Sequence, residues 1–556
     1  MERKTIGSVI SLLLVVGVTI GIVVLNTDQK GDSNDELSTH TKTVEAICQN
    51  TDDNKLCHET LTPVEAKEPR DYIKAVMKHS MDSVIKAFNM SDNLKVENMN
   101  SSTGIKMALE DCKDLLEFAI DELEASSFVF SDENKYDVAT ELKNWLSAVI
   151  AYTQSCLDGF NTDSEKKIQS QLQTGSLDNV EKLTALALDV VAELTQILSV
   201  FNLTLNAKPT SRRLLVDLDK GGYPTWMSLK DRKLLASGDS IKPHAVVAKD
   251  GSGKFKTILD AINAYPKNQK GRYVIHVKAG IYDEYITVDK KKTNILLFGD
   301  GPTKTIITGS KNFKDGVKTL RTATFSTQAN DFIAKSIAFE NTAGPEGHQA
   351  VALRVQGDRS AFFDCAMRGY QDTLYAHAHR QFYGNCEISG TVDFIFGYAT
   401  TLIQNSKIIV RKPGPNQQNI VVADGTVQKN MPTGVVLQNC EIIPEKSLIP
   451  DRLKVKSYLA RPWKAFSRAI FMESTIGDFI QPDGFLPWQG NQFLNTCYFA
   501  EFGNAGPGAD AKNRVKWGRG VLQKNDSALY TAEQWLQAKT WLPATGIPFE
   551  PGFTRA

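Results

Sequence analysis

The pattern of hydrophobic and polar positions divides the chain into a helical part and a part rich in short strands. Between residues 41 and 205, apolar residues recur at intervals of three and four. In ALEDCKDLLEFAIDELEAS, residues 108–126, the apolar stripe consists of Leu109, Cys112, Leu115, Leu116, Ala119, Ile120 and Leu123. Such spacing places the stripe on one face of an amphipathic helix. Later segments repeat the pattern and short polar loops separate them, which predicts an antiparallel four-helix bundle.

From residue 245 to residue 556 the pattern changes to short β-branched runs separated by Gly, Asn and Asp turns. RYVIHVKAGIY, TNILLFGDG and TKTIITGS are examples, and the short motif NCEI occurs twice, at 385–388 and 439–442. Many short strands without helices between them predict an all-β domain, either a sandwich or a solenoid.

The spacing of polar residues favours the solenoid. Gln349, Gln371 and Asp393 are 22 residues apart, and Cys365 and Cys386 are 21 apart. One coil of a parallel β-helix takes roughly 20–30 residues. Equivalent residues of successive coils then stack at about the interstrand spacing of 4.7–4.9 Å. We therefore expect Gln349, Gln371 and Asp393 to form a ladder, with Asp372 beside it, and the two cysteines to be close enough for a disulfide.

The N-terminus carries a targeting signal. After MERK, residues 6–25 contain no charged side chain. This stretch of twenty residues is long enough to span a bilayer, and the basic residues before it favour a cytosolic N-terminus. We expect residues 1–27 to be a signal peptide or a signal anchor, which is the only predicted membrane contact. Residues 206–244 lack periodicity and contain SRRLL and DRKLL, which predicts an exposed linker with processing sites at Arg212–Leu215 or Arg232–Leu235.

Charge is distributed unevenly although the formal net charge is zero. Residues 236–556 hold 39 Lys and Arg against 28 Asp and Glu, a surplus of +11, so residues 1–235 carry −11. This indicates a basic half that attracts a polyanion and an acidic half that could cover it. Eight cysteines without CxxC spacing agree with an oxidising compartment and disfavour zinc. The N-glycosylation sequons are at Asn89, Asn100, Asn202 and Asn525.

Two stacked carboxylates suggest chemistry at Asp372 and Asp393. Both cannot ionise easily, so their pKa values move apart and one can act as nucleophile while the other holds a proton. The amides of Gln349 and Gln371 could donate hydrogen bonds to a developing oxyanion. Such an assembly suits acyl transfer and needs no metal or cofactor. The alternative is a ladder of Asp, Asn and Gln that only stabilises the turns of a solenoid.

Five ordered motifs give the chain a specific resemblance. GIYDE (280–284), QAVALR (349–354), GYQDTLY (369–375), DFIFG (393–397) and LARPW (459–463) resemble those of plant pectin methylesterases, or pectinesterases, over residues 245–555. Residues 41–205, with four cysteines, resemble the invertase/pectin methylesterase inhibitor family. The resemblance implies a right-handed parallel β-helix catalytic domain behind an inhibitor-like pro-domain.

The resemblance also implies roles for individual residues. Asp393 would be the nucleophile on the C6 methyl ester of galacturonate, and Asp372 the proton donor and then the base. Gln371 and Gln349 would stabilise the transition state. The substrate-binding residues implied are Thr319, Gln349, Arg461, Trp463, Tyr375 and Phe396.

Further implications concern cysteines, partners and location. The expected disulfides are Cys48–Cys57, Cys112–Cys156 and Cys365–Cys386, while Cys440 and Cys497 would be buried free thiols. No cofactor is implied. The partners would be methyl-esterified homogalacturonan, a processing protease and a separate proteinaceous inhibitor, with no nucleic acid. The precursor would enter the secretory pathway, with membrane anchoring in the Golgi as one route, and the enzyme would reach the plant cell wall.

One position departs from the pattern, because Ala460 stands where the resembled family has Gly. If that position required a positive φ, alanine would cost about 1 kcal/mol and shift Arg461 slightly. Two alternatives remain open from sequence. A β-helix with two carboxylates could be a glycosidase. The helical region could also serve as a Golgi retention device or a folding aid instead of an inhibitor.

Overall fold

The computed structural model describes residues 33–66, 69–98, 100–128, 138–193 and 242–555. The predicted signal or anchor segment (1–27), most of the linker with both processing sites, and Asn202 lie outside these residues. No helix of the described residues is long and apolar enough to cross a bilayer. The other three sequon asparagines are exposed.

The N-terminal part is helical, as the periodicity predicts. Its α-helices are α2 (Ser33–Cys48), α3 (Asn54–Leu61), α4 (Pro69–Glu97), α5 (Thr103–Phe128), α6 (Val138–Asp158), α7 (Asp163–Leu172) and α8 (Asp178–Ala192), with a π-helical turn η2 (Gln173–Leu177). Helix α5 packs against α4 and α6, and α8 packs against the same two helices. A capping box of Thr162 and Glu165 starts α7. We call residues 33–193 the helical domain.

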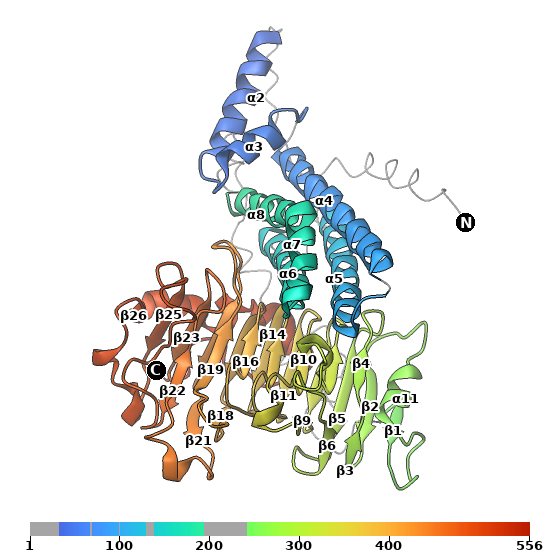
Figure 1. Ribbon diagram of the computed structural model, residues 1–556, viewed down its shortest axis with the longest axis vertical. Coiled ribbons are helices and arrows are strands. Elements are labelled where there is room, and N and C mark those ends of the chain that lie inside the picture. The colour runs from blue at the N-terminus through green and yellow to red at the C-terminus, as the bar shows by residue number, and fades with distance from the viewer. Residues whose placement is uncertain (1–32, 67–68, 99, 129–137, 194–241, 556) are drawn as a thin grey trace, which may run out of the picture.

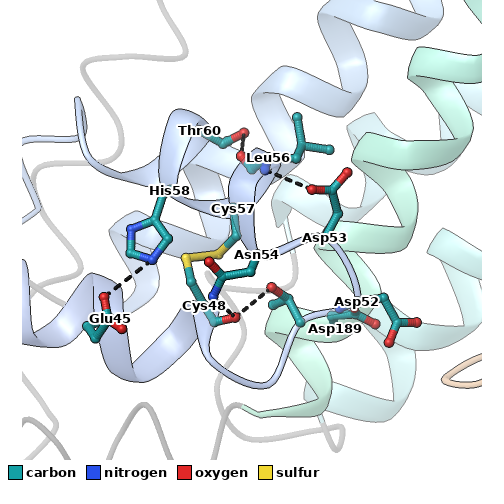
Figure 2. Close-up of a disulfide and its surroundings, with 11 residues drawn as sticks. Glu45, Cys48, Asp52, Asp53, Asn54, Leu56, Cys57, His58, Thr60 and Asp189 are labelled. Atoms are coloured by element: carbon teal, nitrogen blue, oxygen red, sulfur yellow. Dashed lines mark hydrogen bonds and ion pairs between the residues drawn. A yellow bond between two sulfur atoms is a disulfide. The ribbon is translucent and has the colours of Figure 1, made fainter.

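Two disulfides tie the helical domain together. Cys48–Cys57 joins the end of α2 to α3 (Figure 2), and Cys112–Cys156 joins α5 to α6. These are the two pairings that the resemblance implies for this domain. Beside the first bridge, the backbone N–H of Asp52 donates to Asp189 of α8 at 2.9 Å (Figure 2). The loop between α2 and α3 is thereby fixed to the helices that pack beside it.

Residues 245–521 form a parallel β-helix of three sheets, and every strand pair is parallel. The first sheet contains β1 (Ala245–Val247), β2 (Tyr273–Val277), β5 (Ile295–Gly299), β8 (Ile333–Lys335), β11 (Ser360–Phe363), β14 (Arg380–Gly384), β17 (Thr400–Gln404), β20 (Gly434–Gln438), β23 (Arg468–Met472), β25 (Tyr498–Phe502) and β26 (Gly520–Val521). The second contains β4 (Ile286–Val288), β7 (Phe325–Thr327), β10 (Leu353–Val355), β13 (Leu374–Ala376), β16 (Ile395–Gly397), β19 (Asn419–Asp424) and β22 (Ser457–Ala460). The third contains β3 (Gly280–Asp283), β6 (Thr305–Gly309), β9 (Ala338–Asn341), β12 (Ala366–Arg368), β15 (Glu387–Gly390), β18 (Lys407–Val410), β21 (Glu441–Pro444) and β24 (Thr475–Ile476).

Short helices accompany the sheets. The α-helices are α11 (Ile258–Asn263), α12 (Lys524–Ser527), α13 (Ala532–Trp535) and α14 (Ala538–Trp541). The 3₁₀ turns are η4 (Thr319–Arg321), η5 (Pro345–Gly347), η6 (Ile449–Asp451), η7 (Pro507–Ala509), η8 (Ala511–Asn513), η9 (Ala528–Tyr530) and η10 (Leu542–Thr545). The segment after β26 packs its apolar side chains on the outer face of the first sheet. The solenoid alternative is therefore the observed one, and the sandwich is not formed.

The expected Cys365–Cys386 disulfide is absent, because both residues are buried free thiols. They occupy equivalent positions on successive coils, and burial together with the neighbouring Cys365 raises the pKa of the Cys386 thiol. Cys365 Sγ lies 3.4 Å from the carbonyl oxygen of Phe363, and Cys386 Sγ lies 3.3 Å from that of Gly384. Each thiol thus contacts a carbonyl two residues earlier on its own coil. Cys440 and Cys497 are also buried free thiols.

Candidate active site

The two aspartates lie side by side on neighbouring coils. Asp372 comes just before β13 and Asp393 just before β16. The N–H of Asp372 donates to the carbonyl of Val392 at 3.1 Å, which continues the β13–β16 register and pairs the aspartates. Both have a positive φ, 62° and 50°. Aspartate tolerates this left-handed conformation better than most residues, so the backbone can turn at these positions.

The two glutamines lie one residue earlier in the same ladder. The N–H of Ala350 donates to the carbonyl of Gln371 at 3.1 Å, while the N–H groups of both Ala352 and Leu353 point at the carbonyl of Thr373. Two residues of one strand therefore face a single residue of the next strand, which is a β-bulge. Because of this bulge, Gln349 lies beside Gln371. Both glutamine side chains are partly exposed, and neither amide bonds to another described residue. Their amide hydrogens are therefore available to a ligand.

Arg461 distinguishes the two carboxyl groups. Its Nε lies 2.7 Å from Oδ1 of Asp393 and its Nη2 contacts Oδ2, which makes a bidentate, charge-assisted pair. Asp372 has no such partner. Burial and the neighbouring Asp393 raise the pKa of Asp372 well above its ordinary value, and Arg461 only partly opposes them. The two carboxyl groups therefore differ in their surroundings, since the environment of Asp372 favours the protonated form and Asp393 lies against the guanidinium of Arg461.

Trp488 supports the arginine from its other side. The guanidinium carbon of Arg461 lies 4.2 Å from the centre of the Trp488 ring, a cation–π contact. Sequence reasoning missed this tryptophan, because it is 27 residues beyond Arg461 in an irregular loop and belongs to no periodic pattern. The stacking fixes the arginine that orients Asp393.

Aromatic side chains form the floor next to the aspartates. The rings of Tyr375 and Phe396 stack with centroids 4.4 Å apart, because their strand positions are directly paired. Trp463 meets Phe396 edge-on at 6.0 Å and lies 4.9 Å from Tyr398. The structure thus brings three predicted substrate residues together and adds Tyr398, which no sequence motif indicated.

Thr319 lies in η4, on the loop between β6 and β7, and none of its hydrogen bonds reaches the aspartates or glutamines.

Ala460, the departure in LARPW, is a buried residue of β22 paired with Val422, and its φ is not positive. The expected strain at Ala460 is therefore absent, because the position is ordinary strand. Gly397 is different, since it has a φ of 137° and a Cβ there would lie 1.8 Å from the carbonyl oxygen of Ala376.

The helical domain lies against the β-helix, with α5, α6 and α7 reaching it (Figure 1). Its apolar core is continuous with Tyr375, Phe396, Tyr398 and the partly buried Trp463. Charged contacts surround this apolar patch. The ion pairs across the two parts are Glu117 and Asp121 with Lys290, Glu165 with Lys318, Glu110 and Asp111 with Arg321, Glu122 with His379, Glu141 with Arg380, Asp52 with Lys429, and Asp158 with Lys464.

In every one of these pairs the helical domain supplies the carboxylate and the β-helix supplies the basic group, which is His379 in one pair and a lysine or arginine in the others. The acidic and basic halves seen in the sequence therefore face each other. Arg380 is the most enclosed of the lysines and arginines in these pairs. It is bidentate to Glu141 at 2.7 and 2.9 Å and also pairs with Asp358 at 2.6 Å.

A buried polar layer joins Ser155 of α6 to the cleft floor. Its hydroxyl lies 3.0 Å from the Tyr375 hydroxyl and 2.9 Å from Nε2 of His377. Arg354 donates to the other ring nitrogen of His377 at 3.1 Å, so that nitrogen is unprotonated. Burial, with the charge of Arg354, lowers the pKa of His377 well below its ordinary value. The contact therefore uses a neutral histidine that is hydrogen-bonded on both sides.

The chemistry of the cleft rests on carboxyl, amide and guanidinium groups. Among the described residues, no group of three or more His, Cys, Asp and Glu side chains is arranged to hold a metal ion. One ionised carboxylate, one neighbouring acid and two free amides can together attack a carbonyl, protonate a leaving group and bind an oxyanion.

Comparison with known proteins agrees with this division into two parts. The family model described as plant invertase/pectin methylesterase inhibitor matches residues 42–190, and the pectinesterase model matches residues 244–539. Pectinesterase 4 of Arabidopsis thaliana is 39% identical over 99% of this chain and 100% of its own. A probable pectinesterase/pectinesterase inhibitor of Brassica napus is 40% identical over 99% of both chains. The solved pectin methylesterase from carrot is 44% identical with a TM-score of 0.56, and it covers 57% of this chain and 100% of its own.

Proposed function

Because the chain belongs to the pectinesterase family, we propose that it hydrolyses the C6 methyl esters of homogalacturonan through Asp393 and Asp372 and that its helical domain holds the enzyme silent. The chain is a carboxylic ester hydrolase with an inhibitor-like domain. The roles of its residues and the silencing follow from the contacts of the cleft.

In the first half of the reaction, the ionised Asp393 attacks the carbonyl carbon of the ester. Electrons move to the carbonyl oxygen, and the amides of Gln349 and Gln371 donate hydrogen bonds to that oxyanion. The tetrahedral intermediate collapses and breaks the bond to the methoxy oxygen, which takes the proton of Asp372 and leaves as methanol. An acyl anhydride between Asp393 and the sugar remains, and Asp372 is now ionised.

In the second half, Asp372 accepts a proton from water as the water attacks the sugar carbonyl of the anhydride. The bond to Asp393 breaks, and the unit is released as galacturonic acid, which then loses its proton to the solvent. Asp372 has regained its proton and Asp393 its charge, so the cycle closes. Arg461 stabilises the charge of Asp393 at the start and the end, and the aromatic floor offers an apolar face to the sugar ring.

The observation that carries this proposal is the asymmetry of the pair, in which Asp393 is bidentate to Arg461 while Asp372 has a raised pKa. The test is methanol release from highly methylated pectin after the helical domain has been cut away. Asp393→Asn should reduce the rate by at least about a thousandfold. A matched control, Asp478→Asn, removes an exposed carboxylate far from the cleft and should change nothing. New reducing ends without methanol would instead indicate a glycosidase.

Silencing is supported by the position of the helical domain on the cleft. Ser155 contacts Tyr375, Asp158 contacts Tyr398 and Lys464, and the aromatic floor belongs to the same apolar cluster as the helices. A sugar polymer could not reach that floor while these contacts persist. Cleavage in the 206–244 linker, with DRKLL or SRRLL as the protease site, would allow the domain to leave. A pure folding aid would not need to stay on the cleft after folding.

The place of action follows from the substrate. Pectin is part of the plant cell wall, so we propose that the enzyme acts there after secretion, with residues 1–27 as its signal or anchor. If they anchor the precursor, uncut protein would be retained in the Golgi as a silent form. The surplus of +11 on residues 236–556 would hold the enzyme on a polymer that becomes more acidic with each ester removed.

A further inference from the structure

Two of the predicted sugar-contacting residues have a lysine as their direct neighbour. Lys318 precedes Thr319, and Lys464 follows Trp463. Each lysine holds one carboxylate of the helical domain. Lys318 Nζ lies 2.7 Å from Glu165, in a pair whose side chains are only 7% and 4% exposed, and Lys464 Nζ lies 2.8 Å from Asp158.

A third cation stands beside them. Arg321 is at the other end of η4 from Lys318, with Thr319 between them. Its Nε lies 2.6 Å from Asp111, and its Nη2 lies 3.1 Å from Glu110. This guanidinium therefore holds two carboxylates of the helical domain at once.

These three cations have no ion pair within their own domain. Every ion pair that Lys318, Arg321 or Lys464 makes with another described residue goes to the helical domain. Lys290 and Lys429 likewise pair only with the helical domain, whereas other cations of the β-helix are paired locally, as Arg411 is with Glu445 and Lys412 with Asp451. What sets Lys318, Arg321 and Lys464 apart is their place beside predicted sugar-contacting residues, where removal of the helical domain would leave them without counter-charges.

We infer that Lys318, Arg321 and Lys464 determine specificity by binding carboxylates of already de-esterified galacturonate units next to the ester under attack. The acidic side chains of the helical domain then occupy the places that these sugar carboxylates take in the active enzyme. The inference rests on the proposed function, because it assumes that the cleft takes homogalacturonan. It adds which neighbouring units the enzyme prefers.

The physical consequence is a preference for partly de-esterified polymer. A methyl ester offers only a neutral oxygen to a lysine, whereas a carboxylate makes a charge-assisted hydrogen bond. Each such contact at a partly exposed site contributes roughly a threefold to fivefold gain in affinity. Since the product of one turnover is a new carboxylate, each reaction improves binding for an ester nearby. This preference should weaken as salt screens the charges.

The test compares two substrates with enzyme obtained by cutting the folded full-length chain at a protease site inserted in the 206–244 linker and removing the helical domain. One substrate is highly methylated pectin, and the other is the same polymer partly de-esterified. The readout is the ratio of kcat/KM for methanol release from the second to that from the first. The variants are Lys318→Gln, Lys464→Gln and their combination, with Lys454→Gln as a control that removes an exposed lysine outside the contact.

We expect the wild type to favour the partly de-esterified polymer, the double variant to lose that preference by roughly tenfold through KM, and the control to keep it. An unchanged ratio in the double variant would overturn the inference, because these lysines would then serve only the helical domain. If the double variant does not fold, the wild-type ratio is measured from low to high salt, and a ratio insensitive to salt also overturns it. Absence of methanol from either polymer with wild type would instead refute the proposed function.

Discussion

Replacing Glu141 by glutamine should loosen the helical domain from the cleft. Glu141 and Arg380 form a bidentate pair whose side chains are 6% and 5% exposed. Losing one partner of a buried ion pair costs about 3–5 kcal/mol. Asp358 still neutralises Arg380 from within the β-helix, and glutamine can keep one hydrogen bond, so we expect a smaller loss than this. A loss of about 2–3 kcal/mol weakens the contact roughly 30- to 150-fold.

The assay uses the chain with a protease site inserted in the linker. After cutting, the two parts remain associated. The sample is then diluted in steps, and the protein concentration at which methanol release begins gives the dissociation constant of the two parts. Glu141→Gln should become active at higher protein concentration than wild type. The control, Glu59→Gln, removes one half of an exposed pair with Lys55 and should behave as wild type. If Glu141→Gln and wild type dissociate alike, the buried pair does not hold the two parts together, and our reading of the contact is incorrect.

Three further outcomes can be measured. Asp372→Asn should lower kcat by about a hundredfold to ten-thousandfold while circular dichroism stays native; normal turnover would rule out its acid–base role. Burial raises the pKa of Asp111 to about 6 against Arg321, from an ordinary 3.8. If Asp111 returns to its ordinary pKa of 3.8 once the parts separate, its contribution to the contact is present at low pH and is lost as pH rises through about 6, so the two cut parts should separate more readily at pH 7.5 than at pH 5. Asp111→Asn should flatten this dependence, and an unaltered pH profile would exclude Asp111 as its source. Gly397→Ala should lower Tm by several degrees or prevent folding, because its Cβ would collide with the backbone of Ala376; an unchanged Tm would show that the strand can move aside.

The architecture was predictable where the chain repeats itself. The 3/4 spacing of residues 108–126 predicts helix α5, and the 21- and 22-residue intervals predict a solenoid and the pairing of Asp372 with Asp393. Such patterns are local or periodic, so they need no knowledge of long-range contacts. The bulge at Ala352 and Leu353 was not predictable, because it depends on how two successive coils accommodate one extra residue.

What the sequence could not provide were contacts between segments without a common period. Trp488 under Arg461 and Ser155 against Tyr375 join residues from different loops or domains. The expected Cys365–Cys386 bridge is absent although the two thiols occupy equivalent positions on neighbouring coils, so a shared period does not by itself establish a disulfide. Charge asymmetry predicted that an acidic half could cover a basic one, but not which carboxylate meets which cation.

The most direct test of the account is methanol release from highly methylated pectin by one sample of the full-length chain, measured before and after a single cut in the linker and removal of the helical domain. We predict no methanol before the cut, rapid release after it, and none at either stage from Asp393→Asn. Equal release before and after would contradict the claim that the helical domain closes the cleft. Release by the cut Asp393→Asn variant would contradict the claim that this carboxylate attacks the ester.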